Sequence, residues 1–487
     1  MLLSELINGL DIVGMHGDAE IDIKGIAYDS RKVKEGYLFV CIEGTVTDGH
    51  KFIPGALENK ARALLVSKGV DVPEGVTVVR TDDTRYGLAY VSDKFFGHPS
   101  GALNLVGVTG TKGKTTTTYM IKSILEKSGQ KTGLIGTVEK LIGNEVIYMD
   151  RTTPESYDLQ SLFNDMVAKN IDTAVMEVSS QGLKLHRVSC CDFDIGIFTN
   201  ISRAHIGPRE HTSFEDYLES KIKLFSMCKK GLVNIDSPHS EDVINGAKCE
   251  VLTFGINHDA DIMAKDIVKH ADSVEYNLVA PWYEGFVKVG VPGNFSVYNS
   301  LAAIGVCGLM GVSFDSIRAG LEKVNVKGRV ETVDIGKDYT VIIDYAHSPD
   351  SLENILVTVK DFAKGRVICL FGCGGDRDRM MRPMMGEISG RLADYTIITS
   401  DNPRTENPED IVKDIEEGIK KTDGKYCIIV NRRDAIKHAL EIARKDDVII
   451  LAGKGHETYQ TFKDKTIHFD EREIVRELIK ELDNSCE

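Results

Sequence analysis

The sequence of 487 residues is too long for one hydrophobic core, and its 42% hydrophobic and 27% charged residues are typical of a globular protein. The formal net charge of −15 argues against a general affinity for nucleic acid, because a phosphate backbone would be repelled. No apolar run is long enough to cross a membrane, and the N-terminus lacks the basic start of a secretory signal.

Residues 1–99 predict a small α/β domain. Strand-like runs occur at residues 21–30, 37–44 and 62–67, and a short helix is expected from Ile53 to Lys60. Apolar runs of strand length that alternate with amphipathic stretches are typical of parallel α/β sheets, and this alternation continues over most of the sequence.

Residues 100–327 predict a central domain built on a parallel sheet. The domain opens with the strand Leu103–Gly110, runs directly into a helix from about Lys114, and returns as a strand at residues 131–137. Three more strands and a helix are expected, at residues 173–178, 194–200, 231–236 and about 297–310. The segment Val326–Glu331 (VKGRVE) indicates a hinge that ends this domain.

Residues 328–487 predict a separate, Rossmann-like doubly wound domain. Five apolar runs, each followed by a helical stretch, lie at residues 340–346, 366–372, 394–400, 426–430 and 447–452. The sequence therefore predicts three consecutive α/β domains.

Ten cysteines are scattered along the chain without a C-x-x-C pair. In a chain of this size they indicate reduced thiols rather than a disulfide framework or a zinc site. We therefore expect a cytoplasmic protein.

A glycine-rich loop, residues 107–115 (GVTGTKGKT), lies between the first central strand and its helix. Glycines let the backbone turn sharply and bring N–H groups against phosphate oxygens, and the helix N-terminus adds a positive dipole end. Lys114 is expected to reach the β- and γ-phosphates of ATP, and the Thr115 hydroxyl to hold Mg²⁺. An ordinary turn with a surface lysine is the alternative. Contacts with ATP are expected from Gly110, Thr111, Lys112, Gly113, Lys114, Thr115 and Thr116.

The loop form T-G-T-x-G-K-T-T, with further motifs spread in order over the whole chain, resembles the Mur ligases of peptidoglycan synthesis and their relative folylpolyglutamate synthase. Within that family the chain is most similar to the branch that adds the third residue of the peptide. The resemblance implies three domains that bind a UDP-sugar acceptor, ATP and an incoming amino acid, in that order. It also implies an ATP- and Mg²⁺-dependent ligase that forms an amide through an acyl-phosphate.

Motifs of the first two domains are similar to the family's acceptor-binding elements. Tyr28–Arg31 (YDSR) and Glu43–His50 resemble its uridine-nucleotide elements, and Thr152–Pro154 resembles the segment that binds the acceptor's peptide arm. The resemblance implies acceptor contacts from Ser30, Thr45, Thr152, Thr153, Ser179 and Arg187.

Three residues match the family's magnesium site. Glu177 ends a predicted strand beside the phosphate loop, where α/β folds place ligands; a structural glutamate is the alternative. His205 resembles the ligand of a second Mg²⁺, and Lys221 the lysine whose carbamylation supplies a carboxylate that orients the metal. Carbamylation needs an unprotonated amine in a site that favours negative charge. Without the resemblance, Lys221 would indicate only a solvated helix lysine.

The resemblance also implies contacts with adenine, ribose and phosphate, and an amino-acid pocket in the last domain. Asn299 is similar to an adenine contact, and Arg329, at the hinge, would reach the ATP phosphates. Asp344 and His347 would meet the ribose and the adenine side. The motifs GCGGDRD, DNPR and GKGHE match the amino-acid pocket, with contacts expected from Arg377, Asp401, Asn402, Pro403, Arg404, Gly453 and Glu457.

The DNPR motif is the most informative about the amino acid. In this family an arginine at this position goes with meso-diaminopimelate, whose distal carboxylate a guanidinium can bind with two hydrogen bonds. Glu457 would bind the distal ammonium, so that both charges of the zwitterion are recognised. The resemblance implies a monomer whose partners are small molecules: a UDP-muramoyl peptide, the diamino acid and ATP.

Some positions depart from the family pattern, and most lie where the acceptor's peptide arm is expected. They are Arg151, Gln181, Leu185, Ala204 and Met381, which stand where asparagine, histidine, glutamine, aspartate and lysine are common. One alternative is a paralogue that adds lysine or another amino acid to an altered acceptor. Another is a scaffold that binds ATP without catalysis.

Overall fold

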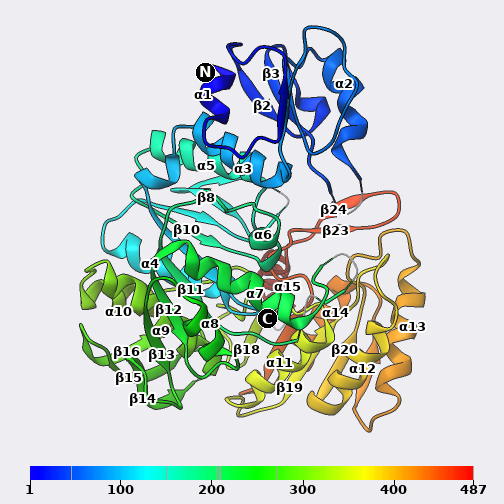
Figure 1. Ribbon diagram of the computed structural model, residues 1–487. Coiled ribbons are helices and arrows are strands. Elements are labelled where there is room, and N and C mark those ends of the chain that lie inside the picture. The colour runs from blue at the N-terminus through cyan, green and yellow to red at the C-terminus, as the bar shows by residue number, and fades with distance from the viewer. Residues whose placement is uncertain (45–46, 150, 204–205, 208–209, 271, 486–487) are drawn as a thin grey trace. The chain divides into compact units, whose positions relative to one another are not determined.

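The computed structural model describes all residues except 45–46, 150, 204–205, 208–209, 271 and 486–487 (Figure 1). Its strands form sheets of five, eleven and six strands and one two-stranded hairpin. By their contacts the residues divide into two compact units, made of residues 1–263, 279–283 and 298–320, and of residues 264–278, 284–297 and 321–487. The three large sheets confirm the predicted α/β class, and the domain boundaries at residues 99/100 and 327/328 stay predictions.

The first sheet has the order β1-β5-β4-β3-β2 and is parallel except for β1. Its strands are β1 (Gly14–His16), β2 (Gly25–Ala27), β3 (Tyr37–Val40), β4 (Ala63–Val66) and β5 (Thr77–Arg80). The helices are α1 (Leu3–Ile7), α2 (Ile53–Glu58) and α3 (Thr84–Phe95), with short 3₁₀ turns η1 (Ser30–Lys32) and η2 (Gly49–Phe52). The three strands and the helix predicted for this region are confirmed.

The second sheet has the order β16-β15-β14-β13-β12-β11-β6-β10-β7-β8-β9. Its strands are β6 (Asn104–Thr109), β7 (Thr132–Ile135), β8 (Lys140–Ile142), β9 (Glu145–Ile147), β10 (Thr173–Glu177), β11 (Phe193–Phe198), β12 (Cys228–Asn234), β13 (Glu250–Gly255), β14 (Ile262–Lys269), β15 (Val274–Val279) and β16 (Glu284–Val289). All strands predicted here are present, and the parallel pairs among β13, β12, β11, β6, β10 and β7 confirm the predicted parallel sheet. The sheet also has an antiparallel edge that the sequence did not predict. β7, β8 and β9 are antiparallel neighbours, because tight turns join them and no crossover helix intervenes.

The helices of this region are α4 (Lys114–Lys127), α5 (Ser156–Ala168), α6 (Ser180–Lys184), α7 (Phe214–Ile222), α8 (Ser240–Gly246), α9 (Asn294–Leu309) and α10 (Phe314–Glu322), with 3₁₀ turns η3 (Pro99–Ala102) and η4 (Lys223–Ser226). The predicted helices that begin near residues 114 and 297 correspond to α4 and α9. No helix among the described residues is long and apolar enough to span a bilayer.

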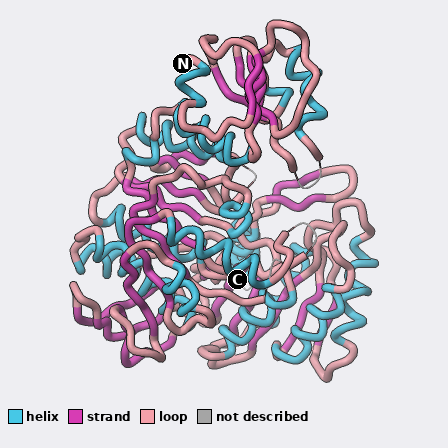
Figure 2. Tube along the Cα trace, in the orientation of Figure 1, coloured by secondary structure: helices cyan, strands magenta, loops and turns pink. Residues whose placement is uncertain are grey.

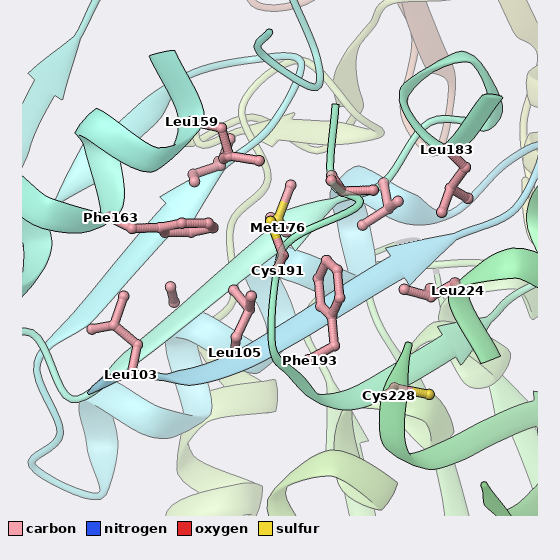
Figure 3. Packing of buried hydrophobic residues seen from close by; sticks show 14 of the residues in the cluster. Leu103, Leu105, Leu159, Phe163, Met176, Leu183, Cys191, Phe193, Leu224 and Cys228 are labelled. Carbon is pink, nitrogen blue, oxygen red and sulfur yellow. The ribbon is translucent and has the colours of Figure 1, made fainter. Parts of the chain in front are cut away.

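A buried hydrophobic cluster fixes the strands that lead to the phosphate loop (Figure 3). Leu105 of β6, Met176 of β10 and Phe193 of β11 lie beside Leu159 and Phe163 of α5, and each is at most 1% exposed. Burial of a side chain of this size stabilises a fold by about 1.5–3 kcal/mol. The cluster therefore sets the register in which the carboxyl ends of β6 and β10 lie side by side.

The third sheet has the order β17-β18-β22-β19-β20-β21 and is parallel except for β17. Figure 2 colours the strands magenta and the helices cyan. Its strands are β17 (Glu331–Val333), β18 (Thr340–Asp344), β19 (Val367–Phe371), β20 (Tyr395–Ile398), β21 (Tyr426–Ile428) and β22 (Val448–Ala452), and a hairpin pairs β23 (Tyr459–Thr461) with β24 (Thr466–His468). The helices are α11 (Pro349–Lys360), α12 (Met381–Leu392), α13 (Pro408–Ile419), α14 (Arg432–Ile442) and α15 (Glu471–Ser485). The five predicted strands and the doubly wound topology are confirmed.

Local sequence signals explain where several of these helices begin. Ser348 caps α11 and Asn407 caps α13, and the side-chain oxygen of each accepts a hydrogen bond from a backbone N–H of the first turn. A proline follows each cap directly, at a position where a helix needs no N–H donor.

Candidate active site

Two glycines shape the loop between β6 and α4. Gly110 has φ +153° and Gly113 has φ +86°, backbone conformations that L side chains rarely adopt. A Cβ atom on Gly110 would lie 2.0 Å from Oγ1 of Thr199, and one on Gly113 would lie 2.5 Å from Oδ1 of Asn299. The loop therefore requires glycine at both positions.

The end of β11 anchors the middle of this loop. The N–H of Thr111 donates to the carbonyl oxygen of Asn200 at 2.9 Å, and the N–H of Lys112 donates to its Oδ1 at 2.9 Å. Because these two N–H groups bind the protein itself, the first turn of α4 supplies the N–H groups for an anion. The Nζ of Lys114 lies over the loop, 2.9 Å from the carbonyl oxygen of Gly110.

Two of the three expected magnesium ligands on described residues, Thr115 and Glu177, touch each other. Oγ1 of Thr115 donates to Oε1 of Glu177 at 2.9 Å, and the glutamate is 1% exposed. The N–H and the hydroxyl of Thr137 donate to the same carboxylate, at 2.9 and 3.0 Å. The Thr137 hydroxyl also lies 3.0 Å from that of Thr152. A carboxylate and a hydroxyl at the mouth of a phosphate loop are hard oxygen ligands of the kind that fit Mg²⁺.

Lys221 is buried, which contradicts the alternative of a solvated helix lysine. It is 1% exposed on α7, whereas Lys223 is exposed. Its Nζ lies 4.5 Å from the centroid of the Tyr217 ring, and the Tyr217 hydroxyl lies 2.9 Å from Oγ1 of Thr111. Burial, and then the charge of Lys114, hold the pKa of Lys221 well below its ordinary value. The amine is therefore suited to be unprotonated, as carbamylation requires.

Asn299 presents an unsatisfied donor beside the loop. The residue is 3% exposed, and its Oδ1 accepts a hydrogen bond from Oγ1 of Thr117 at 3.3 Å. Its buried Nδ2 has no hydrogen-bond partner among the residues that the structure describes. Because buried amide groups are nearly always paired, this atom fits a site that a bound nucleotide completes.

The expected acceptor residues of the central domain lie together behind Glu177. Oγ1 of Thr153 donates to the carbonyl oxygen of Glu177 and accepts from the N–H of Ser179, both at 3.0 Å. Arg187 donates to the carbonyl oxygen of Thr153 at 3.1 Å. Thr152 joins this group through its contact with Thr137.

Three guanidinium groups surround one buried carboxylate next to this group. Glu155 has a side chain that is 5% exposed, and it pairs with Arg85 at 3.4 Å, Arg187 at 3.2 Å and Arg151. Arg151 is one of the positions that depart from the family pattern. The excess of positive charge fits an anionic acceptor.

The expected uridine elements of the first domain are partly buried, and His50 is 8% exposed. Ser30 begins η1, and its carbonyl oxygen accepts a hydrogen bond from Nδ2 of Asn59 at 3.0 Å. Nδ1 of His50 lies 2.6 Å from Oδ1 of Asp48. Two expected site residues, Thr45 and His205, lie outside the described residues.

In the second unit, Arg329, Asp344 and His347 surround Tyr345. The guanidinium carbon of Arg329 lies 5.0 Å from the centroid of the Tyr345 ring, and its Nε has no hydrogen-bond partner among the described residues. Asp344 is buried, and burial raises the pKa of its carboxyl group. His347 is exposed, with Nδ1 2.8 Å from the carbonyl oxygen of Tyr345.

The DNPR and GKGHE motifs meet at the carboxyl ends of β20 and β22. Nδ2 of Asn402 donates to Oε2 of Glu457 at 2.8 Å, and Nζ of Lys454 donates to the same oxygen at 3.0 Å. Asp401 is 8% exposed, and its Oδ2 has no hydrogen-bond partner within the described part of the chain. A Cβ atom on Gly453 would lie 2.8 Å from that oxygen. The two motifs thus form one polar site.

The GCGGDRD motif joins this site through Arg404, whose Nη1 donates to the carbonyl oxygen of Gly375 at 2.6 Å. Pro403 packs against the same glycine: a Cβ atom on Gly375 would lie 1.9 Å from the carbonyl oxygen of Pro403. Arg377, by contrast, is exposed. Arg404 has φ +50°, so its backbone is held in the left-handed region by its surroundings.

Sequence reasoning missed three buried residues of these sites. Lys454 is fully buried inside the GKGHE motif. Tyr217 lies one helical turn before Lys221, and this spacing predicts that the two side chains lie on the same face of α7. Arg382 is 1% exposed, and it donates to Glu406 at 2.7 Å and to Asp414 at 2.8 Å. Nothing local in the sequence marks its burial.

Three Mur ligase family models and several diaminopimelate ligases are similar to this sequence. Residues 108–307 match the family described as Mur ligase middle domain, residues 328–455 match Mur ligase, glutamate ligase domain, and residues 22–92 match Mur ligase family, catalytic domain. The UDP-N-acetylmuramoyl-L-alanyl-D-glutamate–2,6-diaminopimelate ligase of Caldanaerobacter subterraneus subsp. tengcongensis is 48% identical over 482 residues, 99% of each chain. That of Clostridioides difficile is 46% identical over 487 residues, 99% of this chain and 100% of the relative.

Solved structures agree in fold. A structure of a UDP-N-acetylmuramoyl-L-alanyl-D-glutamate–2,6-diaminopimelate ligase covers 99% of both chains with a TM-score of 0.74 and 29% identity. The MurF ligase of Thermotoga maritima in complex with ADP matches with a TM-score of 0.61 and 20% identity, over 94% of this chain and 98% of that one.

Proposed function

The chain belongs to the Mur ligase family, and we propose that it joins 2,6-diaminopimelate to UDP-N-acetylmuramoyl-L-alanyl-D-glutamate while ATP is converted to ADP and phosphate. The product is a precursor of peptidoglycan. The observation that carries the proposal is the contact between Thr115 and Glu177, which puts a hydroxyl and a carboxylate at the end of a glycine loop shaped for phosphate.

The loop and the first turn of α4 would hold the triphosphate. Lys114 can turn from the loop carbonyls toward the β- and γ-phosphates. Asn299 offers the nucleotide its Nδ2, which has no partner in the described part of the chain. In the second unit, Arg329 would offer a phosphate oxygen its Nε, which no described residue pairs with. Asp344 and His347 would contact the ribose and adenine side.

Thr115, Glu177, His205 and a carbamylated Lys221 would hold Mg²⁺, with His205 assigned from the family resemblance alone. When bound, Mg²⁺ neutralises charge on the transferred phosphoryl group. The low pKa of Lys221 supports the carbamate, because only an unprotonated amine adds to CO₂.

The residues of the protein would act by aligning the acceptor carboxylate, ATP and the amino acid for reaction. An oxygen of the acceptor's glutamate carboxylate forms a bond to the γ-phosphorus, and the bond to ADP breaks. The amine of the amino acid then bonds to the acyl carbon, phosphate leaves with the C–O bond electrons, and the amine loses a proton. Lys114 and Arg329 would stabilise the charge that develops on the phosphoryl oxygens. This scheme needs no side-chain nucleophile.

The last domain would select the amino acid. The guanidinium of Arg404 can bind a distal carboxylate with two hydrogen bonds, and Glu457 can bind the neighbouring ammonium. Asp401, Asn402 and Gly453 would complete the pocket, and Asp401 would contribute a buried oxygen that has no partner among the residues the structure describes.

The central and first domains would bind the acceptor, through Thr152, Thr153, Ser179, Arg187 and, in the first domain, Ser30 and Thr45. The excess of guanidinium groups around Glu155 supports an anionic acceptor. We further propose residues 1–99, 100–327 and 328–487 as the acceptor, ATP and amino-acid domains of a monomeric, cytoplasmic enzyme.

Product formation tests the proposal directly. Purified protein is incubated with ATP, Mg²⁺, the UDP-muramoyl dipeptide and either meso-diaminopimelate or L-lysine, and products are measured by mass spectrometry. The expected product is the diaminopimelate tripeptide. A product only with lysine would reassign the amino acid. ATP binding without product from either would favour an altered acceptor, for which Arg151 beside Glu155 is the structural reason.

A further inference from the structure

Buried carboxylates accept hydrogen bonds from the backbone N–H groups of the two residues that flank Arg329. The N–H of Gly328 donates to Oε2 of Glu331 at 2.6 Å, and the N–H of Val330 donates to Oδ2 of Asp344 at 2.8 Å. Glu331 is 7% exposed and Asp344 is 8% exposed. Val330 has φ +46°, which a β-branched residue adopts only when its surroundings enforce it. The linker backbone at Arg329 is therefore fixed from both sides.

Arg472, in the first turn of α15, joins this linker to a second segment. Its Nε lies 3.0 Å from both carboxylate oxygens of Glu331, and its Nη2 donates to the carbonyl oxygen of Gly455 at 3.0 Å. Its Nη1 donates to Oδ1 of Asp470 at 2.8 Å. Because a guanidinium donates in fixed directions, three simultaneous partners leave the side chain little freedom. Arg472 thereby ties the linker to the loop Gly453–Glu457.

The linker and that loop also touch through two glycines. Gly328 has φ +67° and Gly455 has φ +54°, and a Cβ atom on Gly328 would lie 2.1 Å from the backbone nitrogen of His456. The carbonyl oxygen of Gly328 accepts a hydrogen bond from the N–H of Tyr345 at 2.9 Å. The two backbones are in direct contact, so a shift of one displaces the other.

The side chain of Arg329 has a defined position, but one of its hydrogen-bond donors has no partner among the described residues. Its guanidinium lies against the Tyr345 ring, and its buried Nε lacks a hydrogen-bond partner among the described residues. A buried donor without a protein partner, on a backbone fixed this firmly, fits a group whose partner is a ligand.

We propose that Glu331 and Arg472 are positioning residues of the ligase, which hold Arg329 and the loop Gly453–Glu457 in one fixed arrangement. The inference rests on the proposed function, in which Arg329 contacts ATP and the loop binds the amino acid. Neither Glu331 nor Arg472 touches a reacting atom, and both act through the backbone. Misplacement of a catalytic group by about 1 Å lowers rates on the order of 100-fold, so their loss reduces turnover.

The test compares Arg472→Ala, Arg472→Lys and Glu331→Gln in the full-length protein, with product formation measured by mass spectrometry. The expected result is a kcat about 10- to 100-fold lower, with the KM for the acceptor changed less than about twofold. Guanidinium ion added to Arg472→Ala restores part of the lost kcat, because it can occupy the vacated position. A merely structural residue would not show this rescue.

Arg433→Ala is the matched control. Arg433 also binds α15, through Glu477 and Glu481 at 2.8 Å each, but its side chain is 37% exposed and does not contact the linker. Its kcat is expected to stay within about twofold of the wild type. If Arg472→Ala does not fold, the kcat values of Glu331→Gln and Arg472→Lys decide the test. Wild-type kcat in those variants, or an equal loss in Arg433→Ala, overturns the inference. Absence of product with the unmodified protein would instead reject the proposed function.

Discussion

The amine of Lys221 lies 4.5 Å from the centroid of the Tyr217 ring, and the hydroxyl of that tyrosine lies 2.9 Å from Oγ1 of Thr111 in the phosphate loop. One fully buried side chain thus contacts both the lysine expected to be carbamylated and the loop expected to bind ATP. Tyr217 therefore links the proposed metal site to the proposed phosphate site through direct side-chain contacts.

Lys221→Met should abolish ligase activity without unfolding the protein. Methionine has a similar length and removes the free-energy cost of burying an amine, so stability at neutral pH should be unchanged or higher. Methionine cannot carry the proposed carbamate, so kcat should fall by about 100-fold or more. Thermal unfolding and product formation check the two expectations. A large loss of stability would show that Lys221 is structural.

The pH dependence of stability offers a second test of the same residue. The folded pKa of Lys221 is lowered below its ordinary value of 10.5, so the unfolded state binds the proton more readily. The unfolding free energy of the wild type should therefore rise, relative to Lys221→Met, as pH increases from the folded pKa toward the unfolded one. Urea unfolding of both proteins at pH 7 and pH 9, in CO₂-free buffer, measures this difference. A constant difference would show that the pKa is not shifted.

Glu177→Gln should weaken metal dependence specifically. The amide keeps the size of the side chain and can still accept the hydrogen bond from Thr115, but it lacks the negative charge. The Mg²⁺ concentration for half-maximal activity should rise, and kcat should fall about 10²- to 10³-fold. Glu126→Gln, near the far end of α4 and paired with Lys122, is the control and should behave as the wild type. Unaltered Mg²⁺ dependence in Glu177→Gln would remove this residue from the metal site.

Arg404→Ala should impair recognition of the amino acid alone. The substitution removes the guanidinium expected at the distal carboxylate, and the KM for diaminopimelate should rise by about 10-fold or more. The backbone at this position has φ +50°, so Arg404→Asn, which tolerates that conformation, separates loss of charge from backbone strain. Steady-state kinetics with each substrate varied in turn give the answer. A matching rise in the KM for ATP would show a general disturbance of the domain.

The sequence predicts the parts of this protein whose signals are local. The strand, glycine loop and helix at residues 104–127 follow one another without interruption, and the periodic apolar runs reveal β18 to β22. The sequence does not predict β13 to β16, whose exposed polar residues interrupt the apolar runs, nor the short edge strands β8 and β9. Burial of Lys221 is a tertiary effect that helical spacing cannot show. The pair Glu331–Arg472 joins positions 141 residues apart, which no pattern within a segment contains.

Comparison of Gly113→Ala with Gly129→Ala separates the effect of backbone strain on stability from the effect of a side chain in the phosphate loop on ATP binding. The two glycines lie at opposite ends of α4 and have nearly equal φ, +86° and +87°. A Cβ atom at Gly129 would meet nothing within 4 Å, whereas one at Gly113 would lie 2.5 Å from Oδ1 of Asn299. Both substitutions should lower the unfolding free energy by about 1 kcal/mol through strain.

Only Gly113→Ala should abolish binding of Mg·ATP, because Asn299 must move or the loop must open. Isothermal titration calorimetry with a non-hydrolysable ATP analogue measures the affinity of each variant, and urea unfolding measures its stability. Gly129→Ala should bind the analogue with wild-type affinity. Wild-type affinity in Gly113→Ala would mean that the triphosphate does not depend on this turn, and the assignment of residues 107–115 as the phosphate loop would then be wrong.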